Sequence, residues 1–317
     1  MYIANPIYDT VFKHLMENER IARFFIETII GMPIESISVS QQERTLFTLP
    51  ASILIPETET TNKNKPLSVI RYDFLATIRT PDGYKKVLIE IQKAKNELDM
   101  ARFRTYVGEQ YRRKDKIIVD GKETEDYLPI ITIYLLGFKL PGTDAIVIHV
   151  SRTYKDVIGC RDLEIKSEFI ECLTHDSFVV QIPRIEGKTR SRLEKMLNVF
   201  EQKYFYDDTK ILKQFLYDEH DEEIREMLHV LSLVGADPEK REEIELERRS
   251  SDFLENYLKL NQDLAQTKQA LAQKNQALAQ KDINTVINAH KAGLPIDTIV
   301  AITGLPTEDI VKIINNI

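Results

Sequence analysis

The stretch that decides the fold reads Arg71-Tyr72-Asp73-Phe74, then Thr80-Pro81-Asp82-Gly83-Tyr84, then Leu88-Ile89-Glu90-Ile91-Gln92-Lys93. Two strand-like runs, residues 69–80 and 84–92, flank the middle segment. An Asp-Gly pair between two alternating runs is a strong hairpin signal. We therefore predict a β-hairpin whose two-residue turn is Asp82-Gly83.

This register predicts which side chains share a face of the sheet. Asp73 then faces Gln92, and Leu75 faces Glu90. Opposed residues project to the same side of a sheet and neighbours along a strand to opposite sides, so Asp73, Glu90 and Gln92 are expected on one face. The other face receives an apolar set that suits a core: Phe74, Ala76, Ile78, Val87, Ile89 and Ile91.

The chemistry of Asp73 and Glu90 in that arrangement is unusual. Two carboxylates that lie close repel each other unless one is protonated or a cation lies between them. Carboxylate oxygens with a backbone carbonyl suit a hard divalent ion such as Mg²⁺ or Mn²⁺, and such an ion at a scissile phosphate activates water. The alternative is an ordinary half-exposed strand face, because burial cannot be read from sequence.

The remaining pattern predicts a mixed α/β (α+β) domain over residues 1–235. Helical spacing of apolar residues predicts helices over 8–30, 98–114, 190–203 and 210–233. Short β-rich runs predict further strands at 37–39, 129–138, 145–150 and 178–182.

The sequence changes character near Pro238, at the start of its last quarter. Leu264, Leu271 and Leu278 repeat every seven residues in the segment 236–282, which favours a helical stalk. The seam is thin, so both a weakly self-associating coiled coil and a solvated single helix remain open. Two Gly-Leu-Pro turns divide residues 283–317 into a small helix-turn-helix-like tail, whose acidic last helix favours packing or oligomerisation over DNA reading.

Composition limits the class of protein. The 317 residues carry 43 Lys and Arg against 50 Asp and Glu, yet residues 85–116 hold ten basic and five acidic residues. Local basic surface matters more than net charge for phosphate binding. The two cysteines suit a reducing compartment, the start lacks a signal-peptide pattern, and the longest uncharged apolar run, 128–138, is too short for a membrane helix. We expect a soluble cytoplasmic protein without a membrane segment.

Several segments together resemble one family. Asp73, a sixteen-residue gap and Glu90-Ile91-Gln92 look like the signature of the PD-(D/E)XK nuclease superfamily. More narrowly, the chain resembles the PD-(D/E)XK nuclease family transposases, which are related to the Rpn recombination-promoting nucleases. The other matching segments are Pro6-Ile7-Tyr8-Asp9-Thr10-Val11-Phe12-Lys13, Arg102-Phe103-Arg104-Thr105-Tyr106, Tyr127-Leu128-Pro129-Ile130-Ile131-Thr132-Ile133 and Gly304-Leu305-Pro306-Thr307-Glu308-Asp309-Ile310.

The resemblance implies a restriction-endonuclease-like fold and a Mg²⁺-dependent (or Mn²⁺-dependent) DNA endonuclease linked to recombination or mobile elements. Asp73 and Glu90, with the carbonyl of Ile91, would hold the metal. Asp73, Glu90 and Gln92 would be catalytic, although the family usually has lysine where this chain has Gln92, and glutamine cannot act as a base.

Two further roles belong to helices. Basic residues of the helix after the metal strand would contact DNA phosphates, which positions DNA without reading its sequence. They are Arg102, Arg104, Arg112 and Arg113. Glu27 in the first helix is a weaker candidate for completing the metal site. The alternative function is a catalytically weak or inactive nuclease fold that binds DNA or assembles through its stalk.

Overall fold

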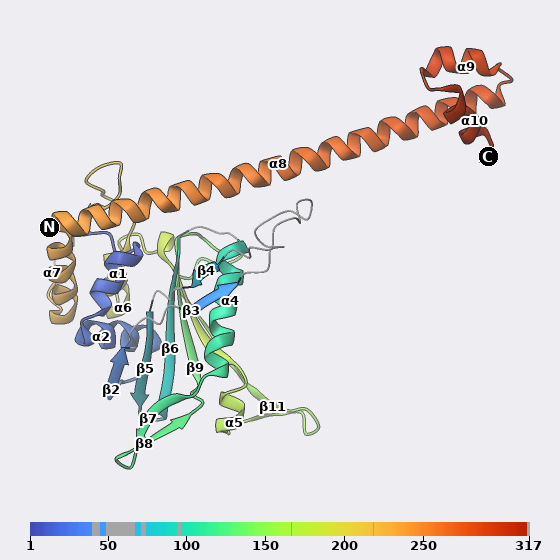
Figure 1. Cartoon of the computed structure of the whole chain (residues 1–317). Coiled ribbons are helices and arrows are strands. Elements are labelled where there is room, and N and C mark those ends of the chain that lie inside the picture. The colour runs from blue at the N-terminus through green and yellow to red at the C-terminus, as the bar shows by residue number, and fades with distance from the viewer. Residues whose placement is uncertain are drawn as a thin grey trace. The chain divides into compact units, whose positions relative to one another are not determined.

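The computed structural model describes residues 1–39, 45–48, 67–70, 74–93, 97–165, 167–217 and 219–315. Only the backbone is described in 45–48, 67–70 and 97–102 and at a few positions of helices farther along the chain. The chain divides into two compact units, Met1–Arg248 and Arg249–Ile317. The predicted mixed α/β class is confirmed: a mixed six-stranded sheet is flanked by helices, and a helical stretch follows (Figure 1).

The sheet places both strands of the predicted hairpin in its interior. Its order is β10 (Val147–Val150), β13 (His175–Gln181), β9 (Ile130–Leu136), β6 (Gly83–Gln92), β5 (Phe74–Thr80) and β2 (Ser36–Val39). Strand β6 runs parallel to β9 and antiparallel to β5, and β9 runs parallel to β13. The candidate metal strand therefore has a neighbour on each side, and side chains can be buried on both of its faces.

The hairpin register differs from the prediction by two residues. Phe74 pairs with Ile89, and Thr80 pairs with Gly83, so the turn is Pro81-Asp82. Gly83 opens β6 with φ +111°, a backbone conformation that glycine tolerates best, and Thr80 donates its hydroxyl to the Gly83 carbonyl. Because side chains alternate with a period of two, this shift preserves the predicted faces although it changes the partners.

One face of the sheet is apolar and carries the main core. The predicted set Phe74, Ala76, Ile78, Val87, Ile89 and Ile91 belongs to this core. Among the helices that contribute buried apolar residues to it are α1 (Asp9–Met16), α2 (Glu19–Ile30), α6 (Arg192–Leu197) and α7 (Glu222–Ala236). Helix α4 (Glu97–Arg112) covers the opposite face (Figure 1).

The predicted helix over residues 8–30 is in fact two helices. The first ends at Met16, and Asn18 caps the second by accepting hydrogen bonds from the amides of Arg20 and Ile21. Asn is favoured at the N-terminus of a helix, where its side chain accepts from free backbone amides, and is less favourable in a helix interior. A new helix therefore begins after Asn18. Gly31, with φ +69°, ends α2 where the sequence predicted the stop.

The predicted helix over residues 210–233 is also wrong in its first half. Strand β14 (Leu212–Gln214) pairs with β1 (Tyr2–Ala4), and α7 begins only at Glu222. The predicted helix at 190–203 is shorter, with α6 followed by the 3₁₀ helix η2 (Asn198–Phe200). Smaller elements are the paired strands β3 (Thr45–Thr48) and β4 (Leu67–Ile70), β7 (Asp115–Val119) and β8 (Lys122–Asp126), β11 (Tyr154–Asp156) and β12 (Arg161–Leu163), the helix α5 (Glu168–Glu171) and the 3₁₀ helix η1 (Ile182–Arg184).

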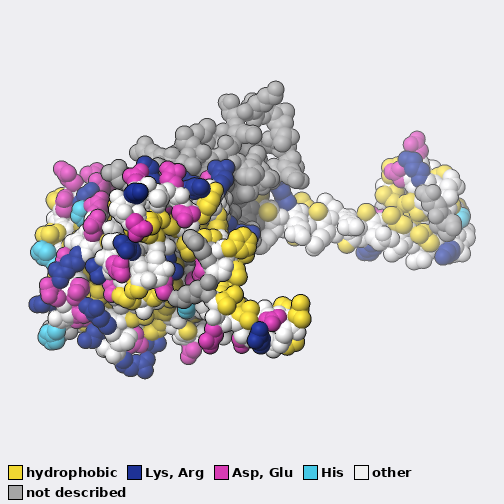
Figure 2. Space-filling model, turned by 90° about the horizontal axis from the view of Figure 1, so that it is seen from below, with side chains coloured by type: hydrophobic (Ala, Val, Ile, Leu, Met, Phe, Trp, Pro, Cys, Tyr) yellow, Lys and Arg dark blue, Asp and Glu magenta, His cyan; other side chains and the backbone are white. Residues whose placement is uncertain are grey.

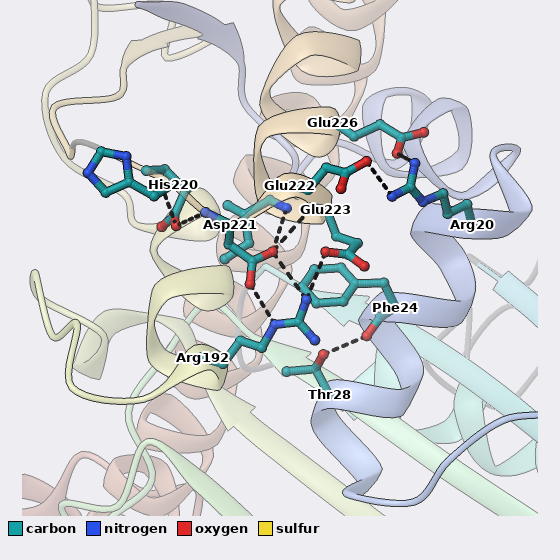
Figure 3. A network of polar contacts seen from close by, with 11 residues as sticks. Arg20, Phe24, Thr28, Arg192, His220, Asp221, Glu222, Glu223 and Glu226 are labelled. Atoms are coloured by element: carbon teal, nitrogen blue, oxygen red, sulfur yellow. Dashed lines mark hydrogen bonds and ion pairs between the residues drawn. The ribbon is translucent and has the colours of Figure 1, made fainter.

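A polar network joins three of the helices on the apolar side (Figure 3). Asp221 caps α7 through the amides of Glu223 and Ile224 and also pairs with Arg192 at 2.6 Å. The guanidinium of Arg192 lies 4.6 Å from the Phe24 ring centroid, and its charge lowers the pKa of Asp221. This network holds α2, α6 and α7 together, and its arginine and carboxylate side chains pair with one another.

The C-terminal elements are helical. Helix α8 (Pro238–Lys291) is continuous over 54 residues, and α9 (Ile296–Thr303) and α10 (Thr307–Asn315) follow the two Gly-Leu-Pro turns. Val286, Ile299 and Ile310 form their small core. Among the described residues, no helix combines the length and the apolar character that crossing a membrane requires.

Candidate functional site

Strand β6 carries the described part of the candidate site. Val87, Ile89 and Ile91 point into the main core, so Glu90 and Gln92 point to the face that α4 covers. Glu90 is 3% exposed and Gln92 is 7% exposed. A carboxylate and an amide therefore sit together on the buried side of an interior strand, where apolar residues are the rule.

Tyr134 lies opposite Glu90 on the neighbouring parallel strand. The two residues are register partners on β9 and β6. Burial is the main reason why the pKa of the Tyr134 hydroxyl is raised well above its usual value, and the charge of Glu90 raises it further, while a hydrogen bond with Thr132 acts in the opposite direction. Tyr134 consequently remains a neutral hydroxyl beside the carboxylate at any ordinary pH.

Helix α4 packs over this side of the sheet through aromatic and apolar contacts. Phe103, Tyr106 and Val107 are buried against Leu88 and Ile130. The rings of Phe103 and Tyr134 lie 4.4 Å apart between centroids. These contacts fix the orientation of α4, and so they decide which of its residues reach the surface.

The structure places three of the four predicted DNA-binding arginines on the surface. Arg104, Arg112 and Arg113 are exposed, whereas the side chain of Arg102 lies outside the described part. Arg112 is 79% exposed and pairs with Glu109 of its own helix at 2.9 Å. On the face that Figure 2 shows, basic side chains alternate with acidic ones among the described residues, so the charge there is mixed.

Asp73 and Ile91 are the other two predicted metal ligands. Asp73 lies outside the described residues, which resume at Phe74. The side chain of Ile91 lies in the main core. The group of this residue that is predicted to bind the metal is its main-chain carbonyl oxygen. Within the described residues, no cluster of three or more His, Cys, Asp or Glu side chains is placed to hold a metal. The donor chemistry of the described pair, carboxylate and amide oxygen, is the kind that Mg²⁺ and Mn²⁺ prefer.

Glu27 belongs to a helix on the other face of the sheet from Glu90, which does not support the prediction that it completes the metal site. It pairs with Arg23 of α2 at 3.6 Å and lies within electrostatic reach of Arg192. Helix α2 packs on the apolar face of the sheet, whereas Glu90 points to the α4 face. Helix α2 thus places Glu27 in the ion-pair region of the three helices.

Lys93, the residue after Gln92, has partners that the sequence did not reveal. Its ammonium pairs with Glu247 at 2.7 Å and lies 4.5 Å from the centroid of the Tyr8 ring. The same carboxylate accepts the amides of Asp9 at 2.9 Å and Thr10 at 3.0 Å, which are at the start of α1. Lys93 and these amides lower the pKa of Glu247 although its burial acts to raise it.

This arrangement, which we call the Glu247 clamp, joins the end of β6, the start of α1 and helix α8. Tyr8 and α1 belong to the apolar side, so Lys93 lies away from the face of Gln92, as strand alternation predicts. In the sequence, Glu247 is one of fourteen acidic residues between 218 and 255, and nothing in the pattern distinguishes it from its neighbours. Sequence reasoning therefore missed it.

A second polar group follows the α4 face toward the start of β6. Lys86 is 1% exposed, pairs with Asp115 at 2.5 Å and has a pKa lowered by burial. On β9 and β13, the Thr132 hydroxyl donates to Ser177 at 2.8 Å. Several polar side chains are therefore buried on this face of the sheet, among them Lys86, Glu90, Gln92 and Thr132.

Cys172 and His175 lie three residues apart, and each contacts another part of the protein. His175 shares a 2.7 Å hydrogen bond with the Tyr111 hydroxyl, and its pKa is lowered by burial and by the charge of Arg152. The thiol of Cys172 lies 3.5 Å from the Tyr127 carbonyl, and neither Cys160 nor Cys172, the two cysteines of the chain, forms a disulfide.

Comparison with protein-family models, with curated proteins and with solved structures finds no match to this chain. The functional reading therefore rests on the residues themselves and on the motifs that they form.

Proposed function

We propose that this protein is a Mg²⁺-dependent DNA endonuclease of the PD-(D/E)XK type, linked to recombination or mobile elements, with Mn²⁺ as an alternative ion. The observation that carries the proposal is the burial of Glu90 beside Gln92 on one face of the interior strand β6. A carboxylate and an amide side by side on one strand face supply oxygen ligands of the kind that a divalent cation takes.

Asp73, Glu90 and the main-chain carbonyl of Ile91 would hold the metal. A divalent ion at that position supplies Lewis-acid stabilisation of a phosphoryl oxygen and a water of lowered pKa. Gln92 would orient the attacking water by a hydrogen bond, and it has no group that can accept the proton as a base. The missing lysine predicts slow chemistry compared with an enzyme that has it.

The surface of α4 would position the nucleic acid. Arg104, Arg112 and Arg113 are exposed on the helix whose inner side covers Leu88 of the metal strand, and Arg102 belongs to the same proposed set. Contacts of arginine to phosphate are independent of base sequence and weaken as salt rises. We therefore expect binding without strong sequence preference and with a clear dependence on ionic strength.

The alternative function is a DNA-binding or assembly protein that retains a nuclease-like fold with little or no catalysis. Two observations favour it: glutamine stands in place of the usual lysine, and both Glu90 and Gln92 are less than a tenth exposed. Under this alternative, the carboxylates would be remnants of a site, and DNA binding would be independent of Mg²⁺.

A plasmid-nicking assay separates the two functions. The purified protein is incubated with supercoiled plasmid in Mg²⁺, in Mn²⁺ and in EDTA, beside Asp73→Asn and Glu90→Gln. The matched control is Glu123→Gln, an exposed carboxylate that pairs with Lys116 on the β7–β8 hairpin. Metal-dependent nicking that both site variants lose and the control keeps supports the nuclease.

Equal nicking by the site variants would assign the activity to a contaminant or to another site and would refute the proposal. Binding of DNA in a gel-shift assay without nicking in either metal supports the alternative. Isothermal titration with Mn²⁺ gives an independent readout, because Glu90→Gln should lose the binding heat even where cleavage is too slow to measure.

A further inference from the structure

Helix α8 presents a line of leucines to solvent. Leu264, Leu271 and Leu278 are 52%, 57% and 50% exposed, and all other side chains from 263 to 281 are exposed as well. Residues seven apart lie on nearly the same side of an α-helix, drifting by only ~20° per heptad. The three leucines therefore form one narrow apolar stripe, which we call the Leu stripe.

The partner that matches this stripe is another helix with the same seven-residue period. The chain itself supplies one, because the heptad that begins at Leu271 repeats its first four residues at Leu278. A second copy aligned in parallel places each leucine of the stripe beside the same leucine of its partner, which is the packing of a two-stranded coiled coil. We propose that α8 forms a parallel two-stranded coiled coil with a second copy of this chain through the Leu stripe.

Charge decides the orientation of the two helices. With the leucines at heptad position d, Lys274 and Lys281 occupy position g, and Ala272 and Ala279 occupy position e. In a parallel pair, g of one helix faces e of the other, so each lysine meets an alanine. In an antiparallel pair, g faces g, and the lysines would repel each other.

Polar seam residues favour the same orientation. Three residues before Leu278 lies Asn275, at position a. Parallel packing pairs Asn275 with its own copy, and two amides can donate to and accept from each other, which also fixes the register. Antiparallel packing would place the amide against leucine, with no polar partner. Lys268, also at position a, repels its copy, so the association should be moderate and should strengthen with salt.

Chain direction gives the coiled coil a consequence for the rest of the molecule. The unit that ends at Arg248 continues directly into the N-terminal half of α8. Parallel pairing therefore tethers two such units to the same end of the coiled coil. The dimer is independent of the proposed function, and if that function holds, the dimer supplies two sites for the two strands of a duplex.

Sedimentation equilibrium on the full-length protein tests the association. We expect the wild type to pass from monomer to dimer as concentration rises, and Leu271→Glu/Leu278→Glu to weaken the dimer at least tenfold. The matched control introduces the same two glutamates at exposed f positions, as Gln273→Glu/Gln280→Glu, and should dimerise like the wild type. Circular dichroism checks that helix content is equal in all three proteins.

A wild type that stays monomeric up to about 100 µM, well above the Kd of a specific dimer, would overturn the proposal. Equal association of the stripe variant and the control would overturn it too, because the contact would then lie elsewhere. Lys268→Leu removes the repulsion at position a and should tighten the dimer at least tenfold. An unchanged or weaker dimer would contradict the proposed helix contact.

Cysteine crosslinking tests the orientation. In a background with Cys160→Ser and Cys172→Ser, Leu264→Cys and Leu278→Cys are made singly and oxidised mildly. Parallel pairing predicts that each variant forms a disulfide-linked dimer by itself. A wild type that dimerises while neither cysteine variant crosslinks with itself would overturn the parallel arrangement.

Discussion

Replacing Glu247 by alanine should destabilise the Met1–Arg248 unit by considerably more than replacing an exposed glutamate of the same helix. The carboxylate of Glu247 accepts the amides of Asp9 and Thr10 and pairs with Lys93, and its side chain is 20% exposed. One side chain thus holds three elements that are distant in the sequence. The Glu247 clamp is therefore a point where a single substitution acts on the end of β6, on α1 and on α8 together.

The magnitude follows from the three contacts. Loss of a helix-capping acceptor costs about 1 kcal/mol, with a range of roughly 0.5–2 kcal/mol. Loss of a partly buried ion pair, in which Lys93 keeps 32% exposure, adds about 1 kcal/mol, because water reaches the ammonium that remains. We expect Glu247→Ala to cost ~2–3 kcal/mol and Glu247→Gln, which keeps one acceptor oxygen, to cost ~1–2 kcal/mol.

Urea unfolding followed by tyrosine fluorescence measures this effect in the correct unit, because twelve of the thirteen tyrosines precede residue 249 and the chain has no tryptophan. The matched control is Glu243→Ala on α8, because the Glu243 side chain is 52% exposed and pairs with Lys240 of the same helix. It should cost less than ~0.5 kcal/mol. A loss in Glu247→Ala no larger than that of Glu243→Ala would refute the clamp.

The pH dependence gives the clamp a second signature. The pKa of Glu247 is lower in the folded chain than in the unfolded chain. Its stabilising contribution is therefore complete above the unfolded pKa near 4.5 and is lost as the pH falls through the folded pKa. Wild type and Glu247→Gln should differ most at neutral pH and converge in acid, and a difference that does not depend on pH would contradict the assignment.

Four further outcomes are expected. Gln92→Lys should speed Mg²⁺-dependent nicking by about tenfold or more, because lysine supplies the charge that glutamine lacks; an unchanged rate in the plasmid assay counts against the role of position 92. Mn²⁺ should raise the thermal midpoint of the wild type but not of Glu90→Gln, through binding to the native state only. Burial lowers the pKa of Lys213 from 10.5 to about 7, so between these pH values the folded state binds fewer protons than the unfolded state. The free energy of unfolding should therefore rise with pH across that window, by up to about 1.4 kcal/mol per pH unit. Urea titrations should show that Lys213→Met loses this rise. Arg192→Ala should lower the free energy of unfolding by ~1 kcal/mol in the same titration. The Arg190 side chain is 83% exposed, so Arg190→Ala should change it by less than ~0.5 kcal/mol.

Alternation along the chain was enough to predict the faces of the central strands. The alternate apolar residues predicted for one face lie in the main core, because the period of two holds whatever the register: Phe74, Ala76, Ile78, Val87, Ile89 and Ile91. The register itself was not predictable from the Asp-Gly signal. Pro81 and Asp82 form the turn, and Gly83 takes its positive φ as the first residue of β6.

Contacts between distant segments account for most of what the sequence did not show. Strand β1 pairs with β14 across about two thirds of the chain, and three-residue strands have too little pattern to be recognised. The break at Asn18 was readable in principle, because Asn is a preferred helix cap, but the apolar spacing continues across it. Glu247 and Lys93 pair over 154 residues, and only the folded chain reveals that pairing.

The two faces of the sheet provide the strongest physical argument about where chemistry takes place. Strand β6 is parallel to β9 and is buried on both sides, and strands in that position normally carry apolar residues on both faces. Here the α4 face instead carries Lys86, Glu90 and Gln92, with Thr132 on the neighbouring strand. Buried polar groups cost free energy unless the fold satisfies them, and the ion pair with Asp115 and the hydrogen bond to Ser177 do so for Lys86 and Thr132. Glu90 and Gln92 differ from these two in chemistry, because a carboxylate and an amide supply oxygen ligands for a divalent cation, and this is why we place the proposed reaction beneath α4.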